Sequence, residues 1–254
     1  MDRNQILTEI GIDIWIRSDE MGSKPDTPIK LKLDIAKQAA LTDSSALQQQ
    51  RIGQTPQKLD NGSSMDLLKA EVLVCQRCQL SKSRFRAVPG LGDIKAKWMF
   101  VGEAPGAEED RQGEPFVGRA GQLLDNIFRA LGVAREDIYI SNILKCHPPT
   151  NRDPRSKEID GCRDFLNREL QIVNPSVVIA LGGVAIRELL QNDMPIDNLR
   201  GKVHKVASSE IPCIATYHPA DILREPSQKK LVWEDLLLAK SVVTESSGGQ
   251  VSQT

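Results

Sequence analysis

The chain has 254 residues, of which 40% are hydrophobic, and its formal net charge at pH 7 is -1. This length allows one substantial core of about 180 to 200 residues plus tails, and no apolar stretch reaches the roughly 18 residues that a membrane helix needs. The near-zero charge excludes attraction to nucleic acid through the field of the whole protein, so a DNA contact has to come from a local basic face.

Residues 1–62 are predicted to form a flexible, low-complexity extension. Residues 18–62 are rich in Ser, Asp, Gln, Lys, Thr and Pro and include the run Gln48-Gln49-Gln50, a composition that is too polar to bury a core. The N-terminus also lacks a basic stretch followed by an apolar one. We therefore expect no signal or transit peptide, no membrane association and a cytoplasmic protein.

Residues 63–243 are predicted to form one α/β domain, followed by a disordered tail at 244–254. Short apolar or β-branched runs predict strands at 97–102, 138–144, 176–182 and 211–216. Helical periodicity occurs between and after them, at 119–131, 156–171, 183–191 and 226–243. Because strand and helix alternate, we expect a three-layer α/β/α sandwich around a four-stranded parallel sheet.

Each predicted strand ends in a turn that carries polar or glycine residues. Glu103, Asn142, the pair Gly182-Gly183 and His218 all come just past a strand. Because the carboxyl ends of parallel strands share one edge of the sheet, these turns are expected to converge on one crevice. The turn Gly102-Glu103-Ala104-Pro105-Gly106 matches neither glycine-rich phosphate-binding pattern, so the crevice is predicted to bind something other than a nucleoside triphosphate or a dinucleotide.

Three side chains near this crevice suit a planar base. The amide of Asn142 can pair with O4 and N3–H of uracil, whereas cytosine presents the opposite order of donor and acceptor. His218 can donate a hydrogen bond where negative charge develops, and Phe116 can stack on a ring. Each also has an ordinary structural interpretation, as a loop-capping Asn, a structural His and a core Phe.

Four of the five cysteines form a possible metal site. Cys75 and Cys78 have the C-x-x-C spacing, and Cys146 and Cys162 follow far along the chain. Four thiolates can hold a zinc ion or an iron–sulfur cluster, and the spacing leaves both open. Cys213 lies inside an apolar strand and is predicted to be part of the core.

Together these residues resemble family 4 uracil-DNA glycosylases, the iron–sulfur branch of the uracil-DNA glycosylase superfamily. The resemblance runs from about Ser64 to Val243. The matching motifs are Cys75-x-x-Cys78, the turn 102–106, Glu108-Glu109-Asp110-Arg111, the segment 115–124, Asn142-x-x-Lys145-Cys146-x-Pro148-Pro149-x-Asn151-Arg152 and Thr216-Tyr217-His218-Pro219-Ala220.

The resemblance implies a monofunctional, monomeric enzyme that flips deoxyuridine out of single- or double-stranded DNA and hydrolyses its glycosidic bond, leaving an abasic site. Carried over by position, Phe116 stacks on the uracil and Asn142 reads its edge. His218 and the backbone N–H of Ala104 stabilise the charge on uracil O2. The resemblance also implies that Cys75, Cys78, Cys146 and Cys162 bind a 4Fe-4S cluster and that Cys213 does not.

The water-activating group does not follow from the resemblance. Where the best-known branch of the superfamily has an Asp for this task, this chain has Ala104. We predict that Glu109, or else Glu103, orients the water, unless the sugar becomes electrophilic enough unaided as the base leaves.

The predicted DNA contacts lie C-terminal to these motifs. Leu223 and Arg224 are on the loop that enters the duplex in relatives, where an apolar wedge offsets part of the unstacking cost. Arg200 and Lys202 are predicted phosphate contacts. Two other readings stay open: a non-catalytic iron–sulfur protein that binds DNA and senses redox state, and a zinc-binding module.

Overall fold

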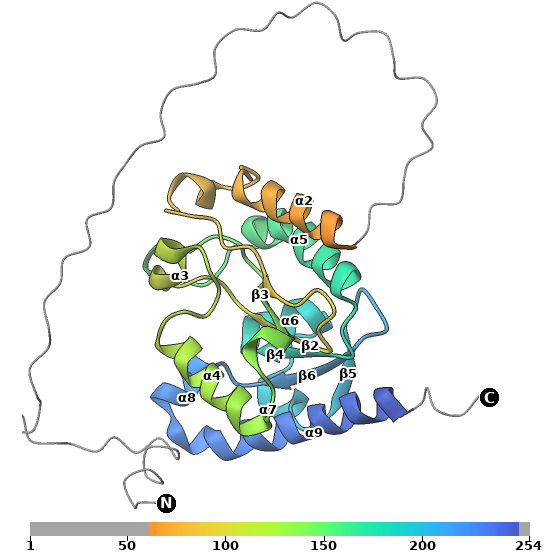
Figure 1. The fold of residues 1–254 in the computed structure, drawn as a ribbon. Coiled ribbons are helices and arrows are strands. Elements are labelled where there is room, and N and C mark those ends of the chain that lie inside the picture. Colours follow the sequence, from red (N-terminus) through yellow and green to blue (C-terminus); the bar gives the residue numbers. More distant parts are fainter. Residues whose placement is uncertain (1–60, 249–254) are drawn as a thin grey trace, which may run out of the picture. The chain divides into compact units, whose positions relative to one another are not determined.

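The structure is a computed structural model that describes residues 61–248, all within one compact unit (Figure 1). Residues 1–60 of the extension predicted at 1–62 and the tail residues 249–254 lie outside the described residues. Asn61 and Gly62, predicted as part of that extension, instead begin a helix. Within the described part, every helix is too short or too polar to cross a bilayer.

The central element is a six-stranded sheet with the order β1-β3-β2-β4-β6-β5. The strands are β1 (Leu91–Gly92), β2 (Trp98–Gly102), β3 (Ile138–Asn142), β4 (Val177–Leu181), β5 (Val203–Lys205) and β6 (Pro212–Thr216). The four predicted strands are β2, β3, β4 and β6, and they pair in parallel as expected. The sequence missed the antiparallel edge strands β1 and β5, because they have only 2 and 3 residues and show no periodicity.

The middle strands are buried on both faces. All five residues of β2, β3 and β4 are buried, which explains their continuous apolar sequences. The last residues of β2 and β3, Gly102 and Asn142, lie opposite each other in the parallel register. This register brings two of the predicted turns together at the carboxyl edge.

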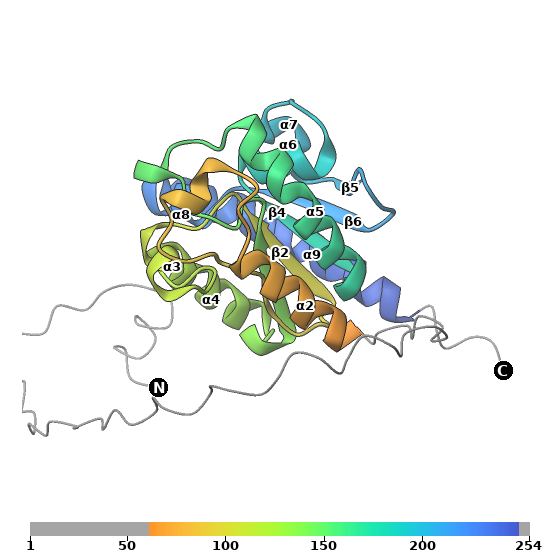
Figure 2. The same cartoon turned by 90° about the horizontal axis from the view of Figure 1, so that it is seen from above.

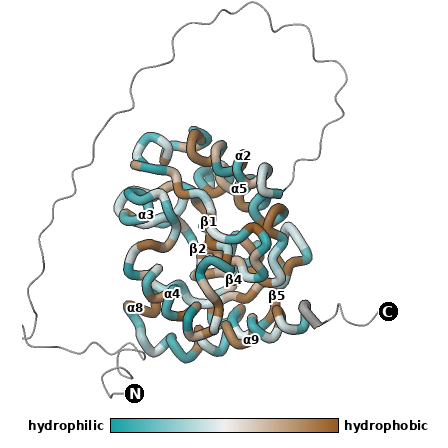
Figure 3. Tube along the Cα trace, viewed as in Figure 1, coloured by the Kyte–Doolittle hydropathy of each residue, from teal (hydrophilic) through white to brown (hydrophobic). Residues whose placement is uncertain are grey.

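Helices cover both faces of the sheet, as the three-layer prediction requires (Figures 1 and 2). Residues of α2 (Asn61–Leu73), α5 (Ser156–Val173) and α6 (Gly183–Leu190) pack with one face of the strands. Residues of α4 (Arg119–Leu131), α8 (Pro219–Arg224) and α9 (Lys229–Gly248) pack with the other. Figure 3 shows the hydrophobic segments gathered at the sheet between these helices.

The remaining helical elements are short. They are α3 (Ala107–Gln112), α7 (Ile196–Leu199) and the 3-10 turns η2 (Gln79–Lys82), η3 (Arg135–Asp137), η4 (Pro149–Asn151) and η5 (Pro226–Gln228). The helix predicted at 226–243 starts with η5 and continues as α9 to Gly248, so it overlaps the segment predicted as a tail.

Candidate active site at the carboxyl edge of the sheet

The predicted turns converge on one cavity of about 460 Å³ at the carboxyl edge of the sheet. Its wall includes residues from the turns after β2, β3, β4 and β6, together with the loop before α4 and the start of α8. The candidate residues among those that line it are Glu103, Ala104, Glu109, Phe116, Asn142, His218 and Arg224. Seven of the predicted site residues therefore meet in one place.

Gly102 allows two of these side chains to approach each other. A Cβ atom on Gly102 would lie 2.5 Å from Oδ1 of Asn142 and 2.7 Å from Cζ of Phe116. Distances this short do not occur in proteins, so only a glycine fits beneath the amide and the aromatic ring. Glycine is therefore required at position 102, because the amide of Asn142 and the ring of Phe116 lie so close to its backbone.

The amide of Asn142 contains an unpaired acceptor. Asn142 is 3% exposed, and its buried Oδ1 has no hydrogen-bond partner within residues 61–248. A buried acceptor without a donor costs about 1 to 3 kcal/mol. The loop-capping interpretation of Asn142 does not account for this atom, whereas a ligand that offers an N–H does.

Phe116 is held in an unfavourable backbone conformation at the cavity wall. Its φ is 55°, a left-handed value that costs a non-glycine residue about 1 to 2 kcal/mol. Arg135 donates to the carbonyls of Pro115 and Phe116 at 2.9 and 3.3 Å, and its guanidinium pairs with Asp125. These contacts fix the ring beside His218, with the two ring centroids 5.6 Å apart.

His218 is the N-cap of α8, and its hydrogen bond with the helix backbone determines which ring nitrogen carries the proton. The backbone N–H of Ala220 donates to Nδ1 of His218 at 3.1 Å, so the proton of a neutral ring is on Nε2. Burial lowers the pKa of His218, which favours that neutral form. The site therefore contains an imidazole whose Nε2–H is available to a ligand.

Glu109 is occupied by the backbone. One carboxylate oxygen accepts from Gly106 N–H at 3.1 Å, and the other accepts from Val117 and Gly118 N–H at 3.0 and 2.9 Å. It thereby ties the turn after β2 to the loop that carries Phe116. Both carboxylate oxygens of Glu109 are therefore engaged by backbone N–H groups, and its role in orienting water stays a prediction.

Glu103 is the freer carboxylate of the two. It lines the cavity and forms no side-chain hydrogen bond or ion pair within residues 61–248. Burial, and then the charge of Asp153, raises the pKa of the Glu103 carboxyl. The half-buried carboxylate of Glu103 therefore has lone pairs that are free to accept a hydrogen bond from a water molecule.

The predicted DNA contacts divide into two groups. Arg224 lines the cavity and pairs with Asp221, and Leu223 beside it is 43% exposed; their role at the DNA stays a prediction. Arg200 and Lys202 are not among the residues that line the cavity. Both side chains have partners within the protein, which the sequence did not indicate.

Arg200 is tied to the protein interior. Its guanidinium bonds both oxygens of Asp235, at 3.3 and 3.1 Å, and the carbonyl of Leu231, and Asp235 is 0% exposed. Lys202 donates to the carbonyl of Asn198 at 3.0 Å. Arg200 therefore supplies the charge that the buried carboxylate of Asp235 needs, and its role as a phosphate contact stays a prediction.

Two further residues of the cavity wall, Asn151 and Arg152, were identified from the sequence only as parts of a family motif, without a role of their own. Thr150 and Asn151 both have positive φ, at 61° and 53°, which is strain of the kind that collects at functional sites. Arg152 is fixed by Glu158 through contacts of 2.9 and 2.6 Å.

The four candidate cysteines belong to one region. Cys146 and Cys162 are in the buried cluster against which Cys75 and Cys78 pack. Charges on Cys75 and Cys78 act on the Cys146 thiol, and charges on Cys146 and Cys78 act on the Cys162 thiol. Burial raises the pKa of Cys162 to about 11, so a cation is needed to hold it as a thiolate.

The cysteine region does not have the geometry of a single-ion site. Within residues 61–248, no three Cys, His, Asp or Glu side chains are grouped closely enough to hold one metal ion. A tetrahedral zinc ion would need sulfur atoms about 3.8 Å apart, from Zn–S bonds of about 2.3 Å. Cys213 is completely buried in β6, where burial raises its pKa to about 12, which fits the predicted core role.

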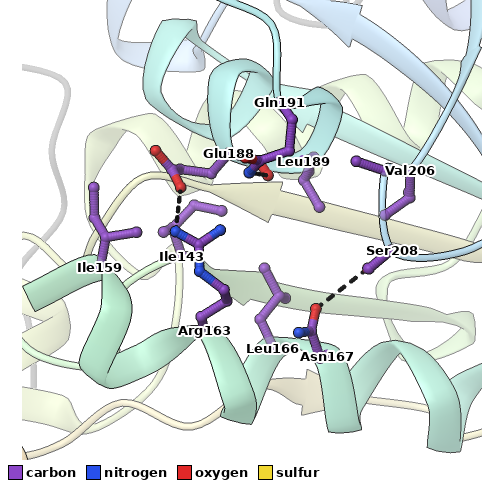
Figure 4. A pocket seen from close by; sticks show the side chains of 11 residues that line it. Ile143, Ile159, Arg163, Leu166, Asn167, Glu188, Leu189, Gln191, Val206 and Ser208 are labelled. Carbon is purple, nitrogen blue, oxygen red and sulfur yellow. Dashed lines mark hydrogen bonds and ion pairs between the residues drawn. The ribbon is translucent and has the colours of Figure 1, made fainter. Parts of the chain in front are cut away.

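A second cavity, of about 180 Å³, lies between α5, α6 and the segment after β5 (Figure 4). Its polar side chains satisfy one another: Arg163 pairs with Glu188 at 3.2 Å, and Ser208 bonds Asn167 at 3.3 Å. In contrast to the cavity at Asn142, it has no buried orphan polar atom among its lining residues. It therefore gives no indication of a ligand.

Known proteins match the part of the chain that contains this cavity. The family model described as the Uracil DNA glycosylase superfamily matches residues 89–237. The chain is similar to the Type-4 uracil-DNA glycosylase of Archaeoglobus fulgidus, with 42% identity over 66% of this chain and 87% of that protein. It is also similar to the Type-4 enzymes of Sulfurisphaera tokodaii, at 42% over 68% and 81%, and of Thermotoga maritima, at 40% over 70% and 94%.

Proposed function

The chain belongs to the uracil-DNA glycosylase superfamily, and we propose that its cavity removes uracil from DNA by hydrolysing the N-glycosidic bond and leaving an abasic site. The enzyme is a hydrolase that acts on N-glycosyl bonds. The observation that carries the assignment is the buried, unpaired Oδ1 of Asn142 beside the ring of Phe116. The other residue roles below are part of the proposal.

Recognition rests on the amide of Asn142. Oδ1 accepts from N3–H of uracil, and the NH₂ group donates to O4. Cytosine has an acceptor at N3 and a donor at C4, so it would leave Oδ1 unpaired and bring like groups together. Sites built to hydrogen-bond a substrate group reject analogues that lack it by factors of about 10⁴ to 10⁵.

The base has to leave the helix to reach this amide. The cavity of about 460 Å³ lies at the edge of the sheet, and no duplex can bring a stacked base into it. Flipping exposes the base faces, and the ring of Phe116 can stack on one of them. Because Arg135 and Glu109 already hold the Phe116 loop, the protein does not need to order it on binding.

Bond cleavage needs stabilisation of the departing base. As the glycosidic bond breaks, negative charge builds on uracil O2, and donors that are already in place lower the barrier. The Nε2–H of neutral His218 is one such donor. The backbone N–H of Ala104 is the other, since Ala104 lines the cavity and its N–H has no acceptor within residues 61–248.

The sugar cation then captures water. Glu103 is suited to orient this water, because its carboxylate lines the cavity and has no partner within the described residues. Its proton affinity is raised by burial, so it can accept the proton that the water loses. We assign the role to Glu103 and the positioning of the Phe116 loop to Glu109.

We also propose that Cys75, Cys78, Cys146 and Cys162 hold a 4Fe-4S cluster. The donor set fits, because Cys146 and Cys162 lie in the buried cluster against which Cys75 and Cys78 pack, and Arg84 donates to Cys146 Sγ at 2.9 Å, as is usual for cluster sulfurs. When bound, such a cluster supplies a cross-link between distant segments. Its role here is to fix the loop after β3, which follows Asn142.

The test is an excision assay with the full chain and an oligonucleotide that contains one deoxyuridine, followed by hot alkali. Strand cleavage at the uracil, and none with cytosine or thymine in its place, is expected. A DNA-binding redox sensor on the same scaffold would bind the oligonucleotide without cleavage. A brown preparation that absorbs near 400 nm is expected for the cluster, and a colourless protein with stoichiometric zinc would contradict it. A cytoplasmic location and a monomeric state stay predictions.

A further inference from the structure

A buried polar cluster lies beside the end of β6, outside both cavities described above. Its centre is the carboxylate of Asp235, which is on α9 and is 0% exposed. The helix α9 packs against β6 (Figure 1), and β6 ends at Thr216, two residues before His218. The cluster is therefore close in sequence to the residue that is proposed to stabilise the departing base, although Asp235 is not among the residues that line the uracil cavity.

Both oxygens of the Asp235 carboxylate are engaged. Oδ1 accepts from the guanidinium of Arg200 at 3.1 Å and from the backbone N–H of Gly201 at 3.0 Å. Oδ2 accepts from Arg200 at 3.3 Å and from the hydroxyl of Thr216 at 2.7 Å. A carboxylate has about four lone-pair sites, so each of them has a donor. The hydroxyl of Thr216 is thereby fixed in a hydrogen bond to a charged acceptor, which is the stronger class of hydrogen bond.

The same strand end is tied to the turn after β4. The backbone N–H of Gly182 donates to the carbonyl of Thr216 at 2.9 Å. A Cβ atom on Gly182 would lie 3.1 Å from Cβ of His218, so the Gly182 backbone packs against the stem of the imidazole. Between the two residues, Tyr217 donates its hydroxyl to Asp197. Side-chain and backbone contacts therefore both locate the segment from which the imidazole projects.

His218 lies where this strand end meets α8. Its carbonyl accepts from the N–H groups of Asp221 and Ile222 at 2.8 and 3.2 Å, and its Nδ1 accepts from Ala220 N–H. These contacts orient the ring relative to α8, whereas the contacts of Thr216 connect the same residue to β6 and α9. A shift of Thr216 is therefore expected to displace the imidazole.

The ion pair between Arg200 and Asp235 gives the cluster direction more than stability. Desolvation offsets much of the attraction in a buried ion pair, so apolar side chains of similar volume are often as stable. Apolar packing is non-directional, however, and cannot hold a hydroxyl in one orientation. The charged carboxylate does hold the hydroxyl of Thr216, and Arg200 supplies the charge that keeps this carboxylate in the interior.

We propose that Asp235 is a positioning residue for His218 and acts through the hydroxyl of Thr216. The inference rests on the proposed function, because it explains how the imidazole is held ready for uracil O2. Stabilisation of a departing base depends on donors that are in place before the bond breaks, and a misplacement of about 1 Å costs about 100-fold in rate. In this proposal Asp235 does not contact the substrate.

The experiment compares two substitutions of Thr216 with a control, all in the full chain. Thr216→Val removes the hydroxyl and keeps the shape of the side chain, and Thr216→Ser keeps the hydroxyl and removes a methyl group. The control is Val177→Ala, which leaves a small void at the buried start of β4, at the opposite edge of the sheet from the cavity. All three should lower the denaturant midpoint, so that a general loss of stability is matched.

Single-turnover excision as a function of protein concentration separates the rate from binding. Thr216→Val should lower the maximal rate by about 10- to 100-fold, with little change in the protein concentration that gives half of that rate, because a donor at O2 acts on the transition state. Thr216→Ser and Val177→Ala should stay close to the normal rate. In a His218→Ala background, Thr216→Val should cause no further loss of rate, since residues that act as a unit are not additive.

Asp235→Asn tests the carboxylate itself. The neutral amide has only one acceptor oxygen, so it cannot serve both Arg200 and Thr216 as the carboxylate does. We expect a loss of rate at least as large as that of Thr216→Val, together with a larger loss of stability, because Arg200 loses its counter-charge. A normal rate in folded Asp235→Asn would overturn the role of Asp235.

A second measurement does not depend on catalysis. The chain has three histidines, so the ring signals of His218 can be followed by NMR after isotope labelling of histidine. Thr216→Val should move these signals, whereas Thr216→Ser and Val177→Ala should leave them close to their normal positions. Unchanged His218 signals in Thr216→Val would overturn the proposal.

Equal losses of rate in Thr216→Val and Val177→Ala would also overturn it, as would a further loss of rate when Thr216→Val is added to His218→Ala. The outcome is separable from the proposed function. Absence of excision by the unmodified chain overturns the catalytic assignment, whereas the ring signals test the positioning of His218 by itself.

Discussion

The ammonium group of Lys145 lies 2.7 Å from a carboxylate oxygen of Glu169, and both side chains are almost completely buried. The same ammonium donates to Ser141 Oγ at 2.6 Å and to the main-chain carbonyl of Asn142 at 3.0 Å. Glu169 in turn accepts from Ser141 and from Gly90 N–H. A buried ion pair therefore holds the backbone of the residue that is proposed to read uracil.

Lys145→Met should reduce both stability and excision, because it leaves the Glu169 carboxylate buried without a counter-charge. Removal of one partner of a buried pair costs about 3 to 5 kcal/mol. The double variant Lys145→Met, Glu169→Gln should regain most of the stability, since no charge is left buried, but not the excision rate, because the Asn142 carbonyl still lacks its donor. Denaturant unfolding and single-turnover excision measure the two effects. If the double variant recovers both, Lys145 is only structural.

Gly102→Ala should abolish excision while the protein stays folded. The new methyl group would meet the amide of Asn142 and the ring of Phe116 at distances below 3 Å, so both side chains have to move from the base-binding position. Overpacking of this kind costs about 1 to 3 kcal/mol of stability, and we expect a loss of at least about 100-fold in the excision rate, as a misplacement of about 1 Å at a reactive centre produces. The matched control is Gly183→Ala.

Gly183 also lines the cavity, but a Cβ there would meet nothing within 4 Å. The control should excise uracil at close to the normal rate. Comparable losses in both variants would mean that the cavity tolerates no added methyl group anywhere, and the specific contact of Gly102 with Asn142 and Phe116 would lose its support.

Glu103→Gln should lower the excision rate by about 100-fold, the lower range for general base catalysis, and should remove the acidic limb of the pH profile. The pKa of Glu103 is raised, so the carboxylate takes up a proton at a higher pH than an ordinary Glu. As the pH falls through that raised value, the rate of the unmodified protein should fall. Single-turnover rates between pH 4 and pH 8 check this, and an acidic limb that persists in the Gln variant would assign it to another group.

Glu109→Gln should weaken binding of the flipped base more than it slows water attack. The amide can replace only part of the three backbone contacts that the carboxylate makes, so the Phe116 loop should lose its fixed position. We expect KM to rise and the affinity for free uracil to fall about 10-fold, the free-energy equivalent of one hydrogen bond to a charged group. A fall in kcat at unchanged KM would instead restore Glu109 to the role of orienting water.

The sequence predicted the central strands because burial on both faces leaves a long apolar run, as in Val177–Leu181. It also predicted which turns meet, since parallel strands put their carboxyl ends together. It did not predict long-range partners. Arg200 has the sequence context of a surface cation, and only the fold shows that Asp235 binds it.

The same limit applies within the site. Lys145 is among the largest fully buried side chains of the described part, although a lysine is normally taken as exposed. Glu109 was identified as a site residue, but its three backbone donors come from two loops whose approach is a property of the tertiary structure. Residue identity can indicate the location of a site, whereas the assignment of roles needs the partners.

His218→Ala should slow base release more than it weakens DNA binding. The Nε2–H of His218 is proposed to act only on the charge that develops on O2, and loss of one such donor costs about 100- to 1000-fold in rate. The substitution also removes the N-cap contact to Ala220 N–H, which is worth about 1 kcal/mol. Asn is a good N-cap, so His218→Asn should keep α8 stable while it loses the reach of the imidazole.

The two variants separate the two functions of this side chain. If the Asn variant is as stable as the unmodified protein in denaturant unfolding yet as slow as the Ala variant in single-turnover excision, the imidazole acts on the substrate. Burial lowers the pKa of His218, so the ring stays neutral to a lower pH than an ordinary His, and its contribution should persist to that lower pH. Recovery of the rate in the Asn variant would show that His218 only caps the helix.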